Sequence, residues 1–216
     1  MARTRSATYD DQRELILAGA AALFAQRGYQ GASMNEVAAA CGLSKAALYH
    51  YFRDKYALLM EIADAHVSHL VAATDEVVQA TDGQPPRARL ERLIERIVLE
   101  YADAQNAHRV LTEDVRFLEP DDQKRVLDKQ RRLVDSFARA VAGMRPDADA
   151  AHLVKPLTML LFGMVNWMFT WHRGDGPLTH ESLAPLVADL FSCGVAAVAL
   201  PSPPAPARIL SPGDPA

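Results

Sequence analysis

Apolar residues recur at three- and four-residue intervals along most of the chain, and no stretch shows the alternation typical of a β-strand. The pattern predicts a first helix over residues 11–26, which Gly28 ends. Ser33 and Glu36 have the spacing of a capping box and predict a short second helix that ends near Ala40. The expected fold class is therefore all-α.

A tight turn and a third short helix follow. Gly42 lies in the turn of residues 41–43 and can adopt the positive φ that a sharp reversal requires. Ser44 is expected to cap a helix that runs to about Tyr51. Two short helices joined by a glycine-containing turn make up a helix-turn-helix, whose second helix lies in the major groove of DNA.

The outward-facing residues of this unit predict contacts with DNA. Small residues at the start of the third helix allow close approach to base edges, while hydroxyl and basic groups reach phosphates. Arg3 and Arg5 are expected to form a flexible arm that enters a minor groove. Core packing is the alternative for Tyr49, Tyr51 and Phe52, and Phe52 is expected to be core. The expected DNA-contacting residues are Ser33, Ser44, Lys45, Ala46, Tyr49, His50, Tyr51 and Lys55.

The rest of the chain predicts a helical bundle. A long helix is expected over residues 55–82, and Gly83 begins the segment that breaks it. Further helices are expected at about 87–106, 109–118, 121–143, 149–173 and 179–199. The expected domains are a helix-turn-helix DNA-binding domain (1–54), a helical ligand-binding and dimerisation domain (55–200) and a disordered proline-rich tail (201–216).

Charge and hydropathy restrict the function classes. The net charge is −4, but residues 1–60 hold seven Lys and Arg against five Asp and Glu, which leaves the remainder at −6. A basic end on an acidic body fits a protein that docks on phosphates through one end. The chain has neither the apolar run of ~20 residues that a membrane span needs nor the core of a secretory signal. A cytoplasmic location without membrane contact is expected.

The reactive residues predict no enzyme and no cofactor. Cys41 and Cys193 match neither a zinc-ligand spacing nor a disulfide framework, so both are expected to be reduced. His66 and His69 share a helix face without a third ligand, so solvent exposure is expected for them. The seven histidines offer no arrangement of nucleophile, base and orienting group.

The segment from Ser33 to Lys55 resembles the DNA-binding domain of the TetR family, and the resemblance covers about residues 9–60. The residues that match the family pattern are Ser33, Val37-Ala38, Gly42-Leu43-Ser44, Tyr49, Tyr51-Phe52, Lys55 and Leu58-Leu59. The resemblance implies base contacts from Lys45, Ala46 and Tyr49. It implies phosphate contacts from Ser33, Ser44, Tyr51 and Lys55.

A homodimer is expected on two grounds. The last two expected helices carry more apolar residues than one side of a monomer needs, and a single short reading helix gains specificity by pairing two half-sites. The TetR resemblance implies a four-helix interface made by these two helices of each subunit. The expected partners are therefore palindromic double-stranded operator DNA, a second copy of the chain and a small-molecule effector.

The effector follows from a second resemblance. Residues 112–118, 129–132, 162–167 and 176–178 resemble one branch of TetR-like regulators, whose members repress catabolic genes and respond to a CoA thioester. An acyl-CoA is thus the expected effector, and repression the expected mode. The alternatives are a sensor of hydrophobic drugs that controls efflux and a DNA-architectural protein without a ligand. The expected effector-binding residues are Tyr101, Arg109, Arg116, Phe117, Phe162, Asn166, Trp167 and Thr170, with core or dimer packing as the alternative for the tryptophans.

Overall fold

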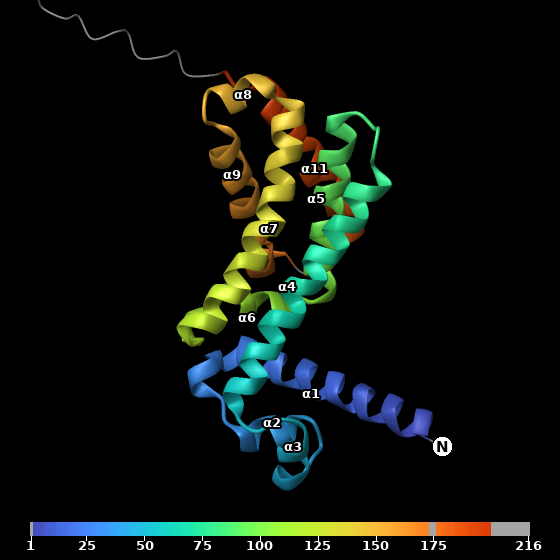
Figure 1. Ribbon diagram of the computed structural model, residues 1–216, viewed down its shortest axis with the longest axis vertical. Helices are drawn as coiled ribbons and strands as arrows, with labels where there is room; N and C mark the ends of the chain where they lie inside the picture. Colours follow the sequence, from blue (N-terminus) through green and yellow to red (C-terminus); the bar gives the residue numbers. More distant parts are fainter. Residues whose placement is uncertain (1, 173–175, 200–216) are drawn as a thin grey trace, which may run out of the picture.

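The structure, a computed structural model, describes residues 2–172 and 176–199, without the side chains of residues 2–8, 150 and 169. It is built from helices, and no strand occurs within these ranges (Figure 1). The expected all-α fold is confirmed. The disorder expected of residues 201–216 concerns a segment outside the described residues. The helices are α1 (Ala2–Gly31), α2 (Met34–Ala40), α3 (Lys45–Tyr51), α4 (Lys55–Ala80), α5 (Pro86–Asp103), α6 (Gln105–Glu113), the 3-10 helix η1 (Val115–Phe117), α7 (Pro120–Met144), α8 (Pro146–Ala150), α9 (Val154–Asn166), α10 (Met168–Trp171) and α11 (His180–Ala197).

The first three helices form a small head at one end of the molecule (Figure 1). Ser33 and Glu36 form the predicted capping box at the start of α2, and the Ser44 hydroxyl accepts a hydrogen bond from the Ala47 N–H to cap α3. Gly42 has φ of 66° in the turn between them, a conformation that costs a residue with a Cβ more than it costs glycine. The two short helices and the turn between them therefore lie at the residues that the capping and turn patterns predicted.

Helix α1 differs from the expectation at its start. It begins at Ala2, so the backbone of Arg3 and Arg5 is helical and the expected flexible arm is wrong; their side chains lie outside the described residues. Gly28, with φ of 73°, interrupts the helical geometry where the sequence predicted the stop, and one short turn follows. The extended α1 projects sideways from the base of the molecule (Figure 1).

Helix α4 joins the head to a body made of the remaining helices. Its N-terminal half packs against α1, and the body helices α5, α6 and α7 pack against it. Its inner side is mostly apolar, which links the head core and the body core in one cluster. The buried α4 residues include Leu58, Leu59, Ile62, Val67 and Leu70. One rigid element thus reaches from the DNA-binding end into the centre of the body.

The outer body helices depart from the expected boundaries. The segment expected as helix 109–118 is α6, which ends at Glu113, followed by η1. The single helix expected over 149–173 is three: α8, α9 and α10, separated near His152 and at Trp167. His152 takes a left-handed φ of 59° to close α8. α9 and α8 lie against α7, and α11 lies against α5 (Figure 1).

Both cysteines are free thiols. In the part of the chain that the structure describes, no helix is both long enough and apolar enough to cross a membrane.

Candidate DNA-binding and effector sites

Helix α3 presents the predicted base-reading residues on the surface of the head. Leu48 is completely buried and fixes the helix against the head core, so the opposite side faces solvent. Tyr49 is 45% exposed, with the Lys45 ammonium 6.0 Å from the centre of its ring. The exposed α3 residues are Lys45, Ala46, Tyr49 and His50. This surface is available to DNA, and the individual contacts stay predictions.

The hydroxyls expected to bind phosphate already serve as helix caps. The Ser33 Oγ donates to Glu36 Oε2 at 2.7 Å and accepts from the Glu36 N–H. The Ser33 hydroxyl and backbone N–H hold the pKa of the Glu36 carboxyl below its usual value. Ser33 and Ser44 are both exposed, so their second role at phosphates stays a prediction. Tyr51 is half-buried and stacks on Tyr9 of α1 at 4.8 Å between ring centres.

Lys55 binds backbone carbonyls, a structural role that competes with the phosphate contact expected of it. Its Nζ donates to the carbonyl oxygens of Tyr29 at 2.7 Å and Ala32 at 2.8 Å, with Gln30 O at 3.4 Å. It also lies 4.5 Å from the centre of the Tyr29 ring. These carbonyls belong to the end of α1, where backbone acceptors lack helical partners. The ammonium group is therefore directed at the end of α1.

Replacing Lys55 with methionine is expected to destabilise the head without changing the salt dependence of DNA binding. The loss of charge-assisted hydrogen bonds predicts a decrease of about 2 kcal/mol in the free energy of unfolding, measured by urea denaturation. The slope of log affinity against log salt should stay as in the wild type. A slope smaller by about one would show that Lys55 does contact a phosphate.

An open pocket of about 520 Å³ lies between α6, η1, α7 and the α9–α10 junction. It brings together three of the predicted effector residues: Arg116, Asn166 and Trp167. The Asn166 Oδ1 is buried and accepts no hydrogen bond from the described part of the chain. A buried amide oxygen without a donor is costly, so this atom is suited to a ligand N–H or to water. The other lining residues are Leu111, Thr112, Glu113, Val115, Gln123, Leu127 and Gln130.

The other predicted effector residues lie elsewhere. Phe162 is buried in the core with its ring 5.1 Å from that of Phe137. Arg109 forms an exposed ion pair with Glu113 one turn along α6. Thr170 is exposed, and its hydroxyl donates to the carbonyl of Trp167. The residues expected to form one effector site therefore lie at several separate places, because the helices that carry them pack in different orientations.

Phe117 and its neighbours connect the pocket to the head. The Phe117 ring lies 5.7 Å from that of Tyr29, directly after the Gly28 kink in α1. The Tyr56 hydroxyl, near the start of α4, donates to Asp122 Oδ2 at 2.7 Å and accepts from the Glu119 N–H at 3.0 Å. The segment from η1 to the start of α7 thus contacts the head on one side and lines the pocket on the other.

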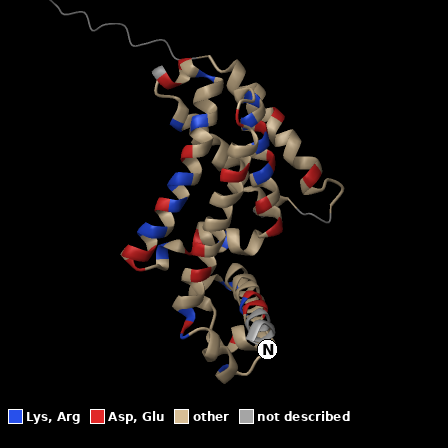
Figure 2. Cartoon of the chain, turned by 45° about the vertical axis from the view of Figure 1, so that its right-hand side comes forward, with Lys and Arg blue, Asp and Glu red and all other residues tan. Residues whose placement is uncertain are grey.

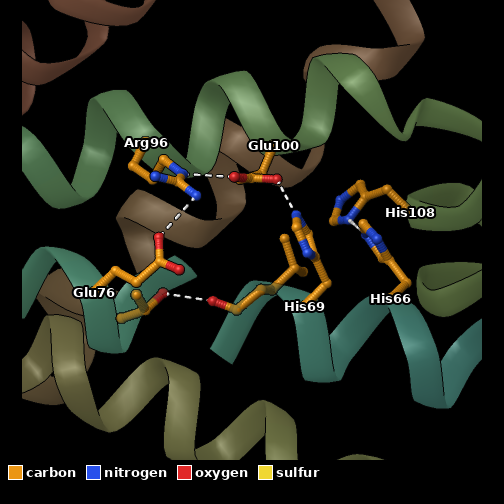
Figure 3. Close-up of polar contacts among 8 residues, drawn as sticks. His66, His69, Glu76, Arg96, Glu100 and His108 are labelled. Atoms are coloured by element: carbon orange, nitrogen blue, oxygen red, sulfur yellow. Dashed lines mark hydrogen bonds and ion pairs between the residues drawn. The ribbon is translucent and has the colours of Figure 1, made fainter. Parts of the chain in front are cut away.

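Buried histidines form a polar cluster that the sequence did not reveal (Figure 3). The expected exposure of His66 is wrong: it is buried on α4, with its Nε2 3.4 Å from His108 Nδ1. His108 stacks on Tyr101, the remaining predicted effector residue, at 3.6 Å between ring centres. Burial lowers the pKa of His66 to about 4 and that of His108 to about 3, so both are neutral at pH 7.

A charged chain lies one turn farther along α4 (Figure 3). The exposed His69 contacts Glu100 Oε2 at 2.5 Å, and Arg96 bonds the same carboxylate at 2.5 Å while reaching Glu76 of α4. The pKa of the Glu100 carboxyl is lowered by these partners against the opposing effect of burial. No group of three or more metal-ligating side chains converges anywhere within the described ranges.

Two family models match the chain. The model described as "Bacterial regulatory proteins, tetR family" matches residues 16–62, and the model described as "Tetracyclin repressor-like, C-terminal domain" matches residues 83–195. The first match contains α2, the turn and α3, and the second contains the pocket beside η1 and, of the histidine cluster, Tyr101 and His108. Together they cover most of the head and of the body.

Individual relatives are similar over most of their length. A solved TetR-family transcriptional regulator from Bordetella parapertussis is 34% identical, with a TM-score of 0.78 over 83% of this chain and 93% of that one. AibR, solved in complex with isovaleryl coenzyme A and operator DNA, is 26% identical, with a TM-score of 0.69 over 83% and 97%. The transcriptional activator FasR of Mycolicibacterium smegmatis is 25% identical over 80% of this chain and 78% of its own.

Proposed function

Because the chain belongs to the TetR family of ligand-responsive transcriptional regulators, we propose that it is a repressor that an acyl-CoA thioester releases from palindromic operator DNA. Members of this family bind DNA and dimerise, and they are not enzymes. The observation that carries the choice of effector is the pocket beside η1, where Asn166 presents an unsatisfied amide oxygen. The proposed protein acts in the cytoplasm and needs no cofactor beyond this effector.

The exposed side of α3 supports the proposed mode of DNA binding. A helix of seven residues reads only a few base pairs, so specificity requires two heads on two half-sites. Half-sites on one face of DNA lie about 34–36 Å or a multiple of that distance apart. We assign base contacts to Lys45, Ala46 and Tyr49, with a contribution from His50, and phosphate contacts to Ser33, Ser44 and Tyr51.

The exposed apolar surface of α9, α10 and α11 supports a dimer through the last two long helices. These helices form an apolar groove of about 390 Å³ whose rim is open to solvent. Such large contiguous apolar surfaces on a monomer mark an interaction site. The exposed large apolar residues of these helices are Met159, Leu160, Met164, Trp167, Trp171, Leu186 and Leu190.

The chemistry of the pocket fits a CoA thioester. The pantetheine arm of such a ligand carries two amides, whose N–H groups match the oxygen of Asn166 and the side chains of Gln123 and Gln130. Trp167 and Leu127 supply apolar surface for the acyl group. The similarity to AibR, solved with isovaleryl coenzyme A, supports the same ligand class for this chain.

The contacts between η1 and the head supply a route for release. Gln123 Nε2 donates to the carbonyl of Val115 at 3.2 Å, so a ligand that engages Gln123 acts directly on η1. Phe117 then transmits a shift of η1 to Tyr29 and the end of α1. A ligand weakens DNA binding only when it prefers the conformation in which the two heads are wrongly spaced.

The test is an electrophoretic shift of the protein on the DNA flanking its own gene, with isovaleryl-CoA added in increasing amounts. The expected result is a complex with a dimer that the thioester dissociates. Tyr49→Ala should weaken specific binding by about 1–3 kcal/mol and serves as the control for base reading. A reporter fusion whose expression the protein raises would overturn repression, and a complex that no thioester affects would overturn the effector.

The runner-up is a repressor that senses hydrophobic drugs. The aromatic groove near Trp167 and Trp171 is the observation that favours it. Release by a hydrophobic cation, with no response to thioesters, would support this alternative. An architectural protein predicts no response to any ligand.

A further inference from the structure

A second cleft, of about 770 Å³, lies between α7 on one side and α8 and α9 on the other. It adjoins the pocket beside η1, because Leu127 and Gln130 of α7 line both. Helix α7 borders the two spaces from Gln123 to Ala138, a length of about 22 Å at 1.5 Å per residue. The combined groove is therefore suited to an extended ligand.

The second cleft has the polar groups of a nucleotide site. Arg131 of α7 and Lys155 of α9 supply cations from its two walls. Lys155 forms no ion pair with any described residue, whereas Arg131 is paired with the exposed carboxylate of Asp128. Asp135 and Asp149 line the same cleft and supply acceptors. Charges of both signs follow one another along α7 (Figure 2).

The wall on the α8 side is held in place by the backbone. His152 adopts φ of 59°, and its N–H donates to the Asp149 carbonyl at 3.0 Å. The next N–H, of Leu153, donates to the Ala148 carbonyl at 2.8 Å, which closes α8 and turns the chain into α9. Asp149, His152 and Lys155 thus come to the cleft from one fixed turn.

The cleft also has apolar lining residues, which suit the face of a flat ring. Val134 and Ala138 of α7 and Val154 and Met159 from the opposite wall provide this surface. A purine base combines an apolar face with an exocyclic amine that a carboxylate can accept. The phosphates of a nucleotide would pair with the two cations of the cleft, and its amine and ribose hydroxyls would donate hydrogen bonds to the two carboxylates.

We propose that the cleft between α7 and α9 binds the phosphorylated nucleotide end of the effector, with Arg131 and Lys155 on its phosphates. Asp135 and Asp149 accept from the adenine amine and the ribose hydroxyls. The acyl-pantetheine part occupies the pocket beside η1, so the inference rests on the proposed function and extends it. It assigns a site to residues that lie outside the effector set predicted from the sequence.

The experiment is calorimetric titration of the full-length protein with isovaleryl-CoA and with isovaleryl-pantetheine, which lacks the nucleotide. Arg131→Ala and Lys155→Ala are each expected to weaken binding of the CoA thioester about tenfold, and together about 100-fold. Neither change should alter binding of the pantetheine thioester. Arg92→Ala, at an exposed position on α5 away from the cleft, is the matched control.

The outcomes separate this inference from the proposed function. Equal wild-type affinities for the two thioesters, or an unchanged affinity in the double variant, would overturn the nucleotide site and leave the effector class intact. If neither thioester binds, the proposed effector fails. Titration with free CoA then tests the cleft by itself. If the wild type binds free CoA and the double variant binds it more weakly, the nucleotide site is retained. If the wild type does not bind free CoA, the nucleotide site is overturned as well.

Discussion

Acidification from pH 7.5 to about pH 5 is expected to lower the free energy of unfolding by about 4 kcal/mol through two histidines alone. His66 and His108 have folded pKa values of about 4 and about 3, because the protein core surrounds both rings. Their pKa in the unfolded chain is about 6.5. Below that pH the unfolded chain binds protons that the folded chain does not, at a cost of about 2 kcal/mol for each histidine by pH 5.

The sign of the effect follows from these pKa values. Both rings are neutral in both states well above pH 6.5, so stability there does not depend on their titration. The decrease in the free energy of unfolding grows as the pH falls and is complete below about pH 3. The titratable groups that act on His66 are His69, which lowers its pKa further, and Glu100, which raises it. Burial of the His66 ring has a larger effect on its pKa than either of these groups.

Urea denaturation at a series of pH values measures this effect. The double variant His66→Leu/His108→Leu should lose most of the pH dependence between 7.5 and 5, whereas His69→Gln should keep it because His69 is exposed. Glu100, whose pKa His69 and Arg96 lower, contributes equally to the wild type and the double variant, and it keeps Arg96 as a partner in His69→Gln. A double variant as acid-sensitive as the wild type would show that the buried pair does not cause the loss.

The head was predictable because its determinants are local. Ser33 and Glu36 are three residues apart, Gly42 acts through its own φ, and Ser44 bonds to Ala47 three residues on. Each rule operates within one helical turn, so a single sequence contains all of it. The position of Tyr49 on the outer side follows from the burial of Leu48 beside it.

The body was less predictable because its contacts join distant segments. His66 and His108 are 42 residues apart, and nothing local marks them as a pair. A signal for burial was present, since His66 lies four residues from both Ile62 and Leu70 on the inner side of α4. The break at Trp167 has neither glycine nor proline beside it, so tertiary packing decides it.

The effector residues show the same limit. Arg116, Asn166 and Trp167 meet in one pocket because η1, α7 and the end of α9 line it together. Phe162 lies one turn before Asn166 but faces the core. Helical periodicity alone does not tell whether a residue on this side of the helix contacts a ligand or packs in the core. Lys55 matches the family pattern at its position, and its carbonyl partners are visible only in three dimensions.

Leu190→Glu is expected to convert the dimer to a monomer and to lower operator affinity by on the order of 100-fold or more. Leu190 is 67% exposed in the single chain and lines the apolar groove of α11, where a partner subunit would cover it. A glutamate there places an unpaired charge in the interface, at a cost of several kcal/mol. Because each head reads only one half-site, a monomer loses half of the DNA contacts.

Light scattering on a sizing column gives the oligomeric state, and fluorescence anisotropy with labelled operator gives the affinity. Leu15→Glu is the matched control, because Leu15 is equally exposed at 64% but lies on α1 in the head. This control should remain a dimer. A dimeric Leu190→Glu protein would place the interface elsewhere, and the apolar groove beside Trp167 would then be open to the hydrophobic ligands of the competing function.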